Sequence, residues 1–156
     1  MSAPETSDPF SAGIRAARLL EEACRSATQA ANSLQLKVVG ELALDIGGQL
    51  GALATLARET TAPDLPTEAA LHCADLANLA ACNVSELPTE EATLASEAAR
   101  LAAGAVHDLR TVVESGGGYS PREHAGNLLR DVRSAAWRAE FAKRVVDESA
   151  GEESPG

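Results

Sequence analysis

The chain has 156 residues and a formal net charge of −10, with 23 acidic residues against 13 basic ones. Because phosphate backbones and anionic membranes attract clustered lysine and arginine, this charge argues against nucleic acid and membranes as partners. Alanine occurs 32 times, and only four residues are aromatic. Alanine is the best helix former and strand-favouring residues are scarce, so the composition predicts an all-α, alanine-rich fold with enough chain for one core.

Five helices are predicted from apolar residues that recur at three- and four-residue spacing. The predicted helices cover residues 10–34, 37–59, 67–86, 89–114 and 121–148. Short connections between consecutive helices favour antiparallel neighbours, so we expect an antiparallel helical bundle. Because Asn32-Ser33 is the only break between the first two segments, one long kinked helix over 10–59 stays open as an alternative.

Capping signals mark where the last three helices begin. The motif Leu-Pro-Thr-Glu occurs at 65–68 and again at 87–90, and threonine is a good N-cap. Thr67 and Thr89 are therefore predicted to cap the third and fourth helices. The sequence Ser-Pro-Arg-Glu at 120–123 is a capping box with proline in the first turn, which predicts the start of the fifth helix.

The two ends of the chain are rich in Pro, Ser, Glu and Gly. Residues 1–9 and 149–156 are predicted to be disordered tails, which leaves 10–148 as the helical bundle domain. No apolar run approaches the ~20 residues of a membrane span, and the polar N-terminus lacks the basic and apolar regions of a signal peptide. We therefore expect a cytoplasmic protein.

The cysteines and histidines do not follow the spacing of metal sites. Cys24, Cys73 and Cys82 are an odd number of cysteines without a C-x-x-C pair, so we expect reduced thiols in a helical core. A di-iron bundle needs Glu-x-x-His pairs, and none occurs here. We therefore expect neither a metal site nor a cofactor.

Three glycines share one face of the second predicted helix. Gly40, Gly47 and Gly51 fall within ~40° of one another at 100° per residue. A glycine inside a helix costs about 1 kcal/mol relative to alanine, so an aligned set indicates that another backbone comes close. The sequence leaves open whether the helix that packs against this glycine face belongs to the same subunit or to another subunit.

The fifth predicted helix has two apolar faces. One face is formed by Leu128, Val132, Ala135, Ala139, Ala142 and Val146. Trp137 and Phe141 lie roughly opposite, together with Val145. A helix that is apolar on both sides is either central in its bundle or half of an interface, and aromatic residues anchor interfaces. We therefore expect a homodimer, with this aromatic face as the favoured contact and the glycine face as the other candidate.

Two polar residues interrupt the apolar stripe of the third predicted helix. His72 and Asn83 share a face with Leu76 and Leu79, and Cys73 borders that face. Buried polar groups need partners, so both are expected to be largely buried. They either fix the helix register or line an interior pocket with His72 as acid, base or ligand contact. The pocket hypothesis predicts a small all-α enzyme, cyclodeaminase-like at most, because the Ala-rich helices resemble the all-α cyclodeaminase/cyclohydrolase family but lack its Pro- and Gly-rich N-terminal signature.

His107 is expected on the outside of the fourth helix, away from its apolar stripe. The string His-Asp-Leu-Arg-Thr at 107–111 resembles the phosphoacceptor box of sensor histidine kinases, which places an exposed histidine on a bundle helix. The resemblance implies that His107 is the phosphoacceptor of a histidine phosphotransfer module. Val112 stands where the proline that usually follows the threonine would be.

The sequence therefore supports three functional hypotheses in a definite order. The first is a non-enzymatic helical-bundle protein that binds a protein partner or a small ligand and forms a homodimer. The second is the small enzyme with an interior pocket around His72 and Asn83. The third is phosphotransfer through His107.

Overall fold

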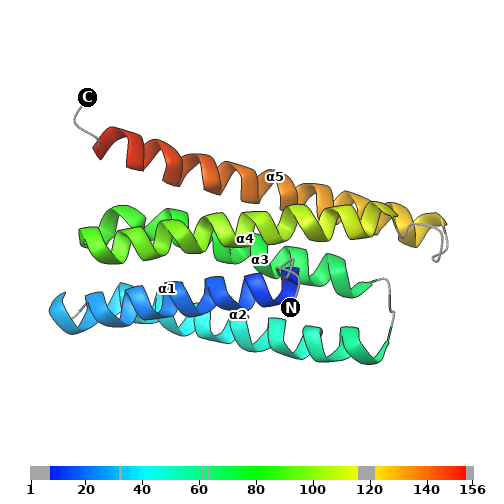
Figure 1. Ribbon diagram of the computed structural model, residues 1–156, viewed down its shortest axis with the longest axis horizontal. Coiled ribbons are helices and arrows are strands. Elements are labelled where there is room, and N and C mark those ends of the chain that lie inside the picture. The colour runs from blue at the N-terminus through cyan, green and yellow to red at the C-terminus, as the bar shows by residue number, and fades with distance from the viewer. Residues whose placement is uncertain (1–7, 32, 61, 63, 116–121, 154–156) are drawn as a thin grey trace, which may run out of the picture.

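The computed structural model describes residues 8–31, 33–60, 62, 64–115 and 122–153. These residues form five α-helices and one short 3₁₀ helix: α1 (Pro9–Ala31), α2 (Leu34–Glu59), α3 (Asp64–Asn83), η1 (Val84–Glu86), α4 (Thr89–Ser115) and α5 (Arg122–Glu153). The described part of the chain contains no strand. The prediction of an all-α helical bundle is confirmed, and consecutive long helices run in opposite directions (Figure 1).

The first two helices are separate, so the alternative of one kinked helix over 10–59 is wrong. The two helices pack side by side along their lengths (Figure 1). Ser33 is extended, with φ −86° and ψ 119°, and its hydroxyl accepts a hydrogen bond from the Leu36 amide at 3.3 Å. This cap satisfies an amide that would have no partner at a helix start. Leu34 therefore begins α2 instead of ending α1.

Several predicted helix ends differ from the observed ones. The third helix begins at Asp64, so Thr67 lies inside its first turns, where the side chain is buried and its hydroxyl has no hydrogen-bond partner among the described residues. The physical reason is that proline fits the first turn of a helix, so Pro66 can sit inside α3. At the chain ends, α1 begins at Pro9 and α5 continues past the predicted end at 148 to Glu153. The capping residue Ser120 lies outside the described residues.

The helices form three layers (Figure 1). The first layer contains α1 and α2, the second contains α3 and α4, and α5 lies over the second layer in contact with both of its helices. The core is built largely from alanine, and the small side chains let the helices approach closely. At Gly13 of α1, an added Cβ would lie 2.7 Å from Cys73 Sγ and 3.0 Å from Leu50 Cδ1, so α1, α2 and α3 meet there with no room for a side chain.

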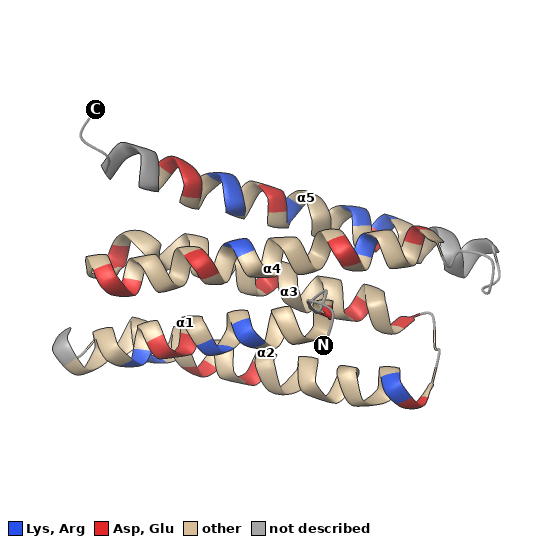
Figure 2. Cartoon of the chain, in the orientation of Figure 1, with Lys and Arg blue, Asp and Glu red and all other residues tan. Residues whose placement is uncertain are grey.

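Helices α2 and α5 are the outer elements of this arrangement. Charged residues occur along most helices, but α2 has a long stretch without any, from residue 46 to residue 57 (Figure 2). Leu42 lies three residues from the buried Val39 and four from Ile46, a spacing typical of a core stripe, and is nevertheless 47% exposed. Within the described ranges, no helix has the length and apolar character that crossing a membrane requires.

Candidate functional site

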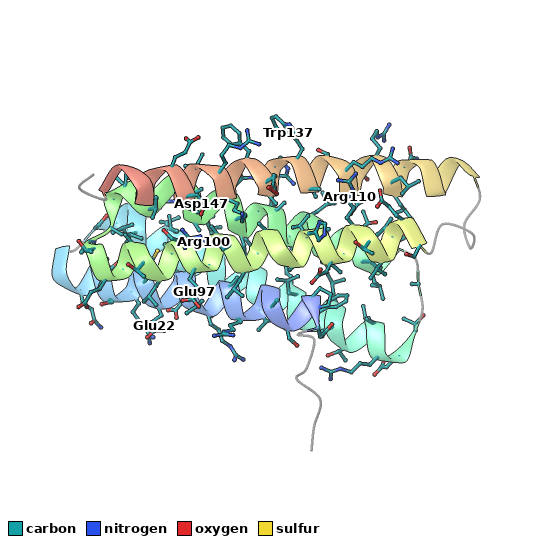
Figure 3. All side chains as sticks on the ribbon, turned by 45° about the horizontal axis from the view of Figure 1, so that its top comes forward. Glu22, Glu97, Arg100, Arg110, Trp137 and Asp147 are labelled. Atoms are coloured by element: carbon teal, nitrogen blue, oxygen red, sulfur yellow. The ribbon has the colours of Figure 1, made fainter. Side chains whose placement is uncertain are left out.

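Two exposed large hydrophobic side chains among the described residues of α5 form an aromatic pair. Trp137 is 71% exposed and Phe141 is 53% exposed. Their rings stack with centroids 6.0 Å apart and an interplanar angle of 22°, because residues four apart lie on the same side of a helix. The Trp137 side chain points away from the rest of the bundle (Figure 3). The pair is therefore an apolar surface that the described part of the chain leaves largely in contact with solvent.

The opposite face of α5 packs on the bundle core, with Leu128 partly buried at its start. Val132, Ala135, Ala139, Ala142 and Val146 are at most 1% exposed. Their contacts are with α3 and α4. The two apolar faces of this helix thus have different environments, since one belongs to the core and the other faces solvent.

A groove between α4 and α5 brings two predicted site residues together. It has a volume of about 450 Å³, and its lining residues are Ala103, His107, Arg110, Arg133, Ala136, Trp137 and Glu140. His107 is exposed on α4, as expected, and Trp137 comes from α5. No sequence pattern connects these two residues, because each was predicted from the pattern of its own helix.

The charges at the end of this groove converge on one carboxylate. Arg110 Nε lies 3.3 Å from Glu114 Oε2, and Arg133 Nε lies 3.9 Å from the same oxygen. Two guanidinium groups therefore share one carboxylate, and Glu140 adds a second carboxylate to the groove lining, so the formal charges of the four side chains cancel. The side chains are 40–60% exposed, so each contact contributes at most about 1 kcal/mol. Their main effect is to hold two arginines beside His107 and Trp137.

Ion pairs on both sides of α5 fix the helix on the layer below. Arg138 Nη1 lies 3.0 Å from Asp75 Oδ1 of α3. Arg100 Nε of α4 donates a hydrogen bond to Asp147 Oδ1 at 2.8 Å (Figure 3), and this bond holds the pKa of Asp147 below its ordinary value. Since one pair joins α5 to α3 and the other joins it to α4, the rotation of α5 about its axis is constrained. The aromatic pair is consequently held on the outside.

The interior polar residues of α3 are not brought together. Asn83 is 5% exposed, as expected, and its amide is satisfied: Nδ2 donates to the Leu79 carbonyl at 2.8 Å, and Oδ1 accepts from Gln35 Nε2 at 3.1 Å. His72 is partly buried, and none of the described residues forms a hydrogen bond with it. The two residues are eleven positions apart, which is about 16 Å along a helix.

The two buried thiols are protonated and unreactive at neutral pH. Cys73 is fully buried, and burial raises its pKa to about 12. Burial and the nearby Glu21 carboxylate raise the pKa of Cys24 to about 11. A thiol needs to be a thiolate to act as nucleophile or metal ligand, so neither residue reacts readily at neutral pH. Cys82 is exposed, which differs from the expectation that the cysteines lie in the core.

Two other hollows lie on the described surface, and neither they nor the groove includes His72, Cys73 or Asn83. A shallow one of about 510 Å³ on the outside of α2 is lined by Glu41, Leu44, Asp45, Gly48, Gln49 and Ala52. A smaller one of about 140 Å³ lies where the start of α4 meets the end of α5 and includes Arg100 and Ser149. The enzyme hypothesis centred on His72 therefore remains a sequence-based prediction.

The glycine face of α2 turns mostly towards α1. An added Cβ at Gly40 would lie 3.3 Å from Cys24 Cβ, and one at Gly47 would lie 3.0 Å from Ala17 Cβ. A Cβ at Gly51 would meet nothing within 4 Å. The close backbone approach predicted from these glycines is therefore internal at the first two positions.

Sequence reasoning missed the exposed apolar residues on the outside of α2. Leu34 is 75% exposed and Leu44 is 62% exposed, and Val38 and Leu56 are about half exposed. The signal for them is that α2 is apolar around most of its circumference, so that its apolar residues cannot all face the core. No group of three or more potential metal ligands occurs within the described residues. Comparison of the chain with family models, curated proteins and solved structures finds no match.

Proposed function

We propose that this protein is a non-enzymatic helical interaction protein that acts as a homodimer, with the outer face of α5 as its contact surface. The observation that carries this proposal is the stacked, exposed pair formed by Trp137 and Phe141. Aromatic side chains are enriched among the residues that supply most of the binding energy at protein interfaces. Trp137 is 71% exposed, and the hydration of so large an apolar surface is unfavourable, so its burial in an interface would be favourable.

The size of the pair suits the centre of an interface. The two side chains expose a few hundred Å² in each copy, since each aromatic side chain has an area of roughly 150–250 Å². At about 25 cal/mol per Å², burying this area in both copies contributes on the order of 10 kcal/mol. That is comparable with the cost of associating two molecules, so the rest of the α5 surface supplies the remaining contact. Closed two-fold symmetry is the commonest arrangement for such a surface.

Sedimentation equilibrium tests this proposal. We expect the wild type to be a dimer and the double variant Trp137→Glu/Phe141→Glu to be a folded monomer, because two charges in the contact surface would have to be buried. The matched control is Leu44→Glu on α2, where an equally exposed apolar residue is replaced, and this variant should remain a dimer. Dissociation by the Leu44 substitution alone would move the interface to α2, and a monomeric wild type would contradict the proposal.

Phosphotransfer through His107 is a second candidate, and the α4–α5 groove favours it. The imidazole is exposed and shares the groove with Arg110 and Arg133, whose guanidinium groups suit the oxygens of a phosphoryl group. In such a reaction an imidazole nitrogen takes the phosphoryl group from a phosphorylated donor protein, whose own residue leaves. Acid-labile labelling of the wild type that is lost in His107→Gln would support this candidate. Absence of labelling with any donor would count against it.

The cellular setting that we propose is the cytoplasm. The three cysteines are free, including the exposed Cys82, and unpaired thiols persist in reducing compartments. The net charge of −10 supports a protein partner over nucleic acid or an anionic membrane.

The α4–α5 groove also leaves room for a small ligand, which native mass spectrometry of the protein from its own host would detect as added mass.

A further inference from the structure

We propose that two copies pair through antiparallel α5 helices, with the two-fold axis between Trp137 and Phe141 and with Arg130 of each copy facing Glu148 of its partner. This inference rests on the proposed homodimer and adds the direction and register of its helices. It follows from the spacing, exposure and charge of the residues along the outside of α5.

The outside of α5 carries a regular seam. Six exposed residues follow one another at alternating spacings of four and three, namely Arg130, Ser134, Trp137, Phe141, Arg144 and Glu148. This alternation averages 3.5 residues, which is the repeat by which two helices stay in contact along their length. The seam lies directly opposite the buried face of α5, so a second helix can pack on it without disturbing the bundle.

The order of residues along the seam selects the antiparallel direction. An axis midway between Trp137 and Phe141 places each of these rings opposite the other ring of the partner. The same axis places Ser134 opposite the partner subunit's Arg144. It also places Arg130 opposite the partner subunit's Glu148, and symmetry makes this pair twice. A parallel pairing would instead set Arg130 against itself and Glu148 against itself, and both contacts are repulsive.

The two end charges of the seam are available for a partner. Arg130 has a side chain that is 74% exposed, and its nearest carboxylate, on the adjacent Asp131, is 3.9 Å away. Within the described part of the chain, Glu148 has no ion pair, although it is exposed. By contrast, Arg138, on the flank of the same helix, is already engaged with Asp75 at 3.0 Å. The antiparallel register thus brings Glu148 opposite an arginine whose one described ion pair, to the neighbouring Asp131, is long at 3.9 Å.

One flank of the seam disfavours this arrangement. On the side of α4, the register brings Arg133 near the partner subunit's Arg144, which is a like-charge contact. Arg133 is already paired with Glu114 at 3.9 Å, and Glu140 lies on the same flank and lines the same groove. Glu114 reduces this repulsion, whereas the same axis brings Glu140 near the partner subunit's Glu140, so the flank on the side of α4 adds like-charge contacts that the seam has to outweigh.

Charge reversal tests the register. We expect Arg130→Glu and Glu148→Arg each to weaken dimerisation by roughly tenfold, since each replaces two opposite-charge contacts by two repulsive ones. The double variant should recover most of the wild-type affinity. The two single variants shift the net charge in opposite directions, so an effect of net charge alone would weaken one dimer and strengthen the other. Lys37→Glu on α2 is the control for a charge reversal outside the seam and should leave the dimer unchanged.

The outcomes separate this inference from the proposed function. If Trp137→Glu/Phe141→Glu dissociates the dimer while both charge reversals leave it unaffected, α5 is the interface and the proposed register is wrong. If the single variants weaken the dimer and the double variant does not recover, the two residues do not face each other and the register is likewise overturned. A monomeric wild type would overturn the homodimer itself.

Discussion

The two outer helices, α2 and α5, both leave apolar side chains exposed, but the arrangement differs. On α2 the exposed residues are aliphatic and spread along the helix from Leu34 to Leu56. On α5 they are two adjacent aromatic rings that stack, with charged residues at both ends of the same seam. Leu34, Val38 and Leu42 lie four residues apart on one side of α2, so α2 also exposes an apolar strip, but that strip lacks the aromatic residues that are enriched at interfaces.

The two helices also differ in how their inner faces are attached. Helix α2 uses glycine to approach α1, with Gly40 and Gly47 in close contact with α1. Helix α5 packs alanine and valine against α3 and α4 and adds ion pairs at its edges, such as Arg100 to Asp147. The comparison indicates that α2 is attached mainly by close approach at its glycines, whereas α5 is attached by side-chain packing together with ion pairs. Three predictions test this difference.

The largest effect is expected at the glycine contact of α2. Replacing Gly47 by valine should lower the free energy of unfolding by about 3 kcal/mol, because its Cβ would press on Ala17 Cβ at 3.0 Å and α1 would have to move. The matched control is Gly48→Val, one residue further along, where an added Cβ meets nothing within 4 Å. Urea denaturation measures both, and equal losses would show that α2 is not attached through this contact.

An intermediate effect should distinguish the two faces of α5. Val132 is fully buried, so Val132→Ala should lower the free energy of unfolding by about 2 kcal/mol through lost contacts and a cavity. Trp137→Ala should change the stability of the monomer by less than about 0.5 kcal/mol, because the side chain is mostly exposed. The measurement is urea denaturation at concentrations low enough to keep the protein monomeric. A comparable loss from both substitutions would place Trp137 in the core.

The smallest effect concerns the ion pair at the edge of α5. The hydrogen bond from Arg100 lowers the pKa of Asp147 below its ordinary value of 3.8. A carboxyl group whose pKa is lowered on folding stabilises the fold above its unfolded-state pKa, and this contribution is lost as the pH falls through the folded-state value. The wild type should therefore lose this small contribution below about pH 3.8, and Asp147→Asn should lack that part of the decline. Thermal melts from pH 6 to pH 2 measure the difference, and identical profiles would show that the pair adds nothing.

The candidate site illustrates how far local patterns reach. The exposure of His107 and the two apolar faces of α5 were predicted, because both depend only on the spacing of apolar residues along a single helix. The groove that joins them, together with Arg110 and Arg133, was not predicted. Its members come from α4 and α5, and the rotation of one helix relative to another is set by packing between them. The pattern within either helix carries no information about that rotation.

The same limit applies to α2 and α3. Gly40 and Gly47 signalled a close neighbour correctly, but the sequence could not say whether that neighbour was α1 or a second subunit. Leu42 belonged to an apolar stripe by spacing and is nevertheless about half exposed, because α2 is an outer helix with too few neighbours to cover all its apolar residues. His72 likewise lies at the edge of the covered face of α3.

The sequence by itself determined the helical class and the two faces of α5, because helix propensity and apolar spacing act within a few residues, but it left open whether α1 and α2 were one helix. Tertiary structure alone decided which apolar faces were covered, since coverage depends on helices that are distant along the chain. It enclosed the glycines against α1, satisfied Asn83 through Gln35 at 3.1 Å and left the aromatic pair of α5 in solvent. Burial depends on how the layers pack together. The surface that we propose as the interface could therefore be identified only from the tertiary structure.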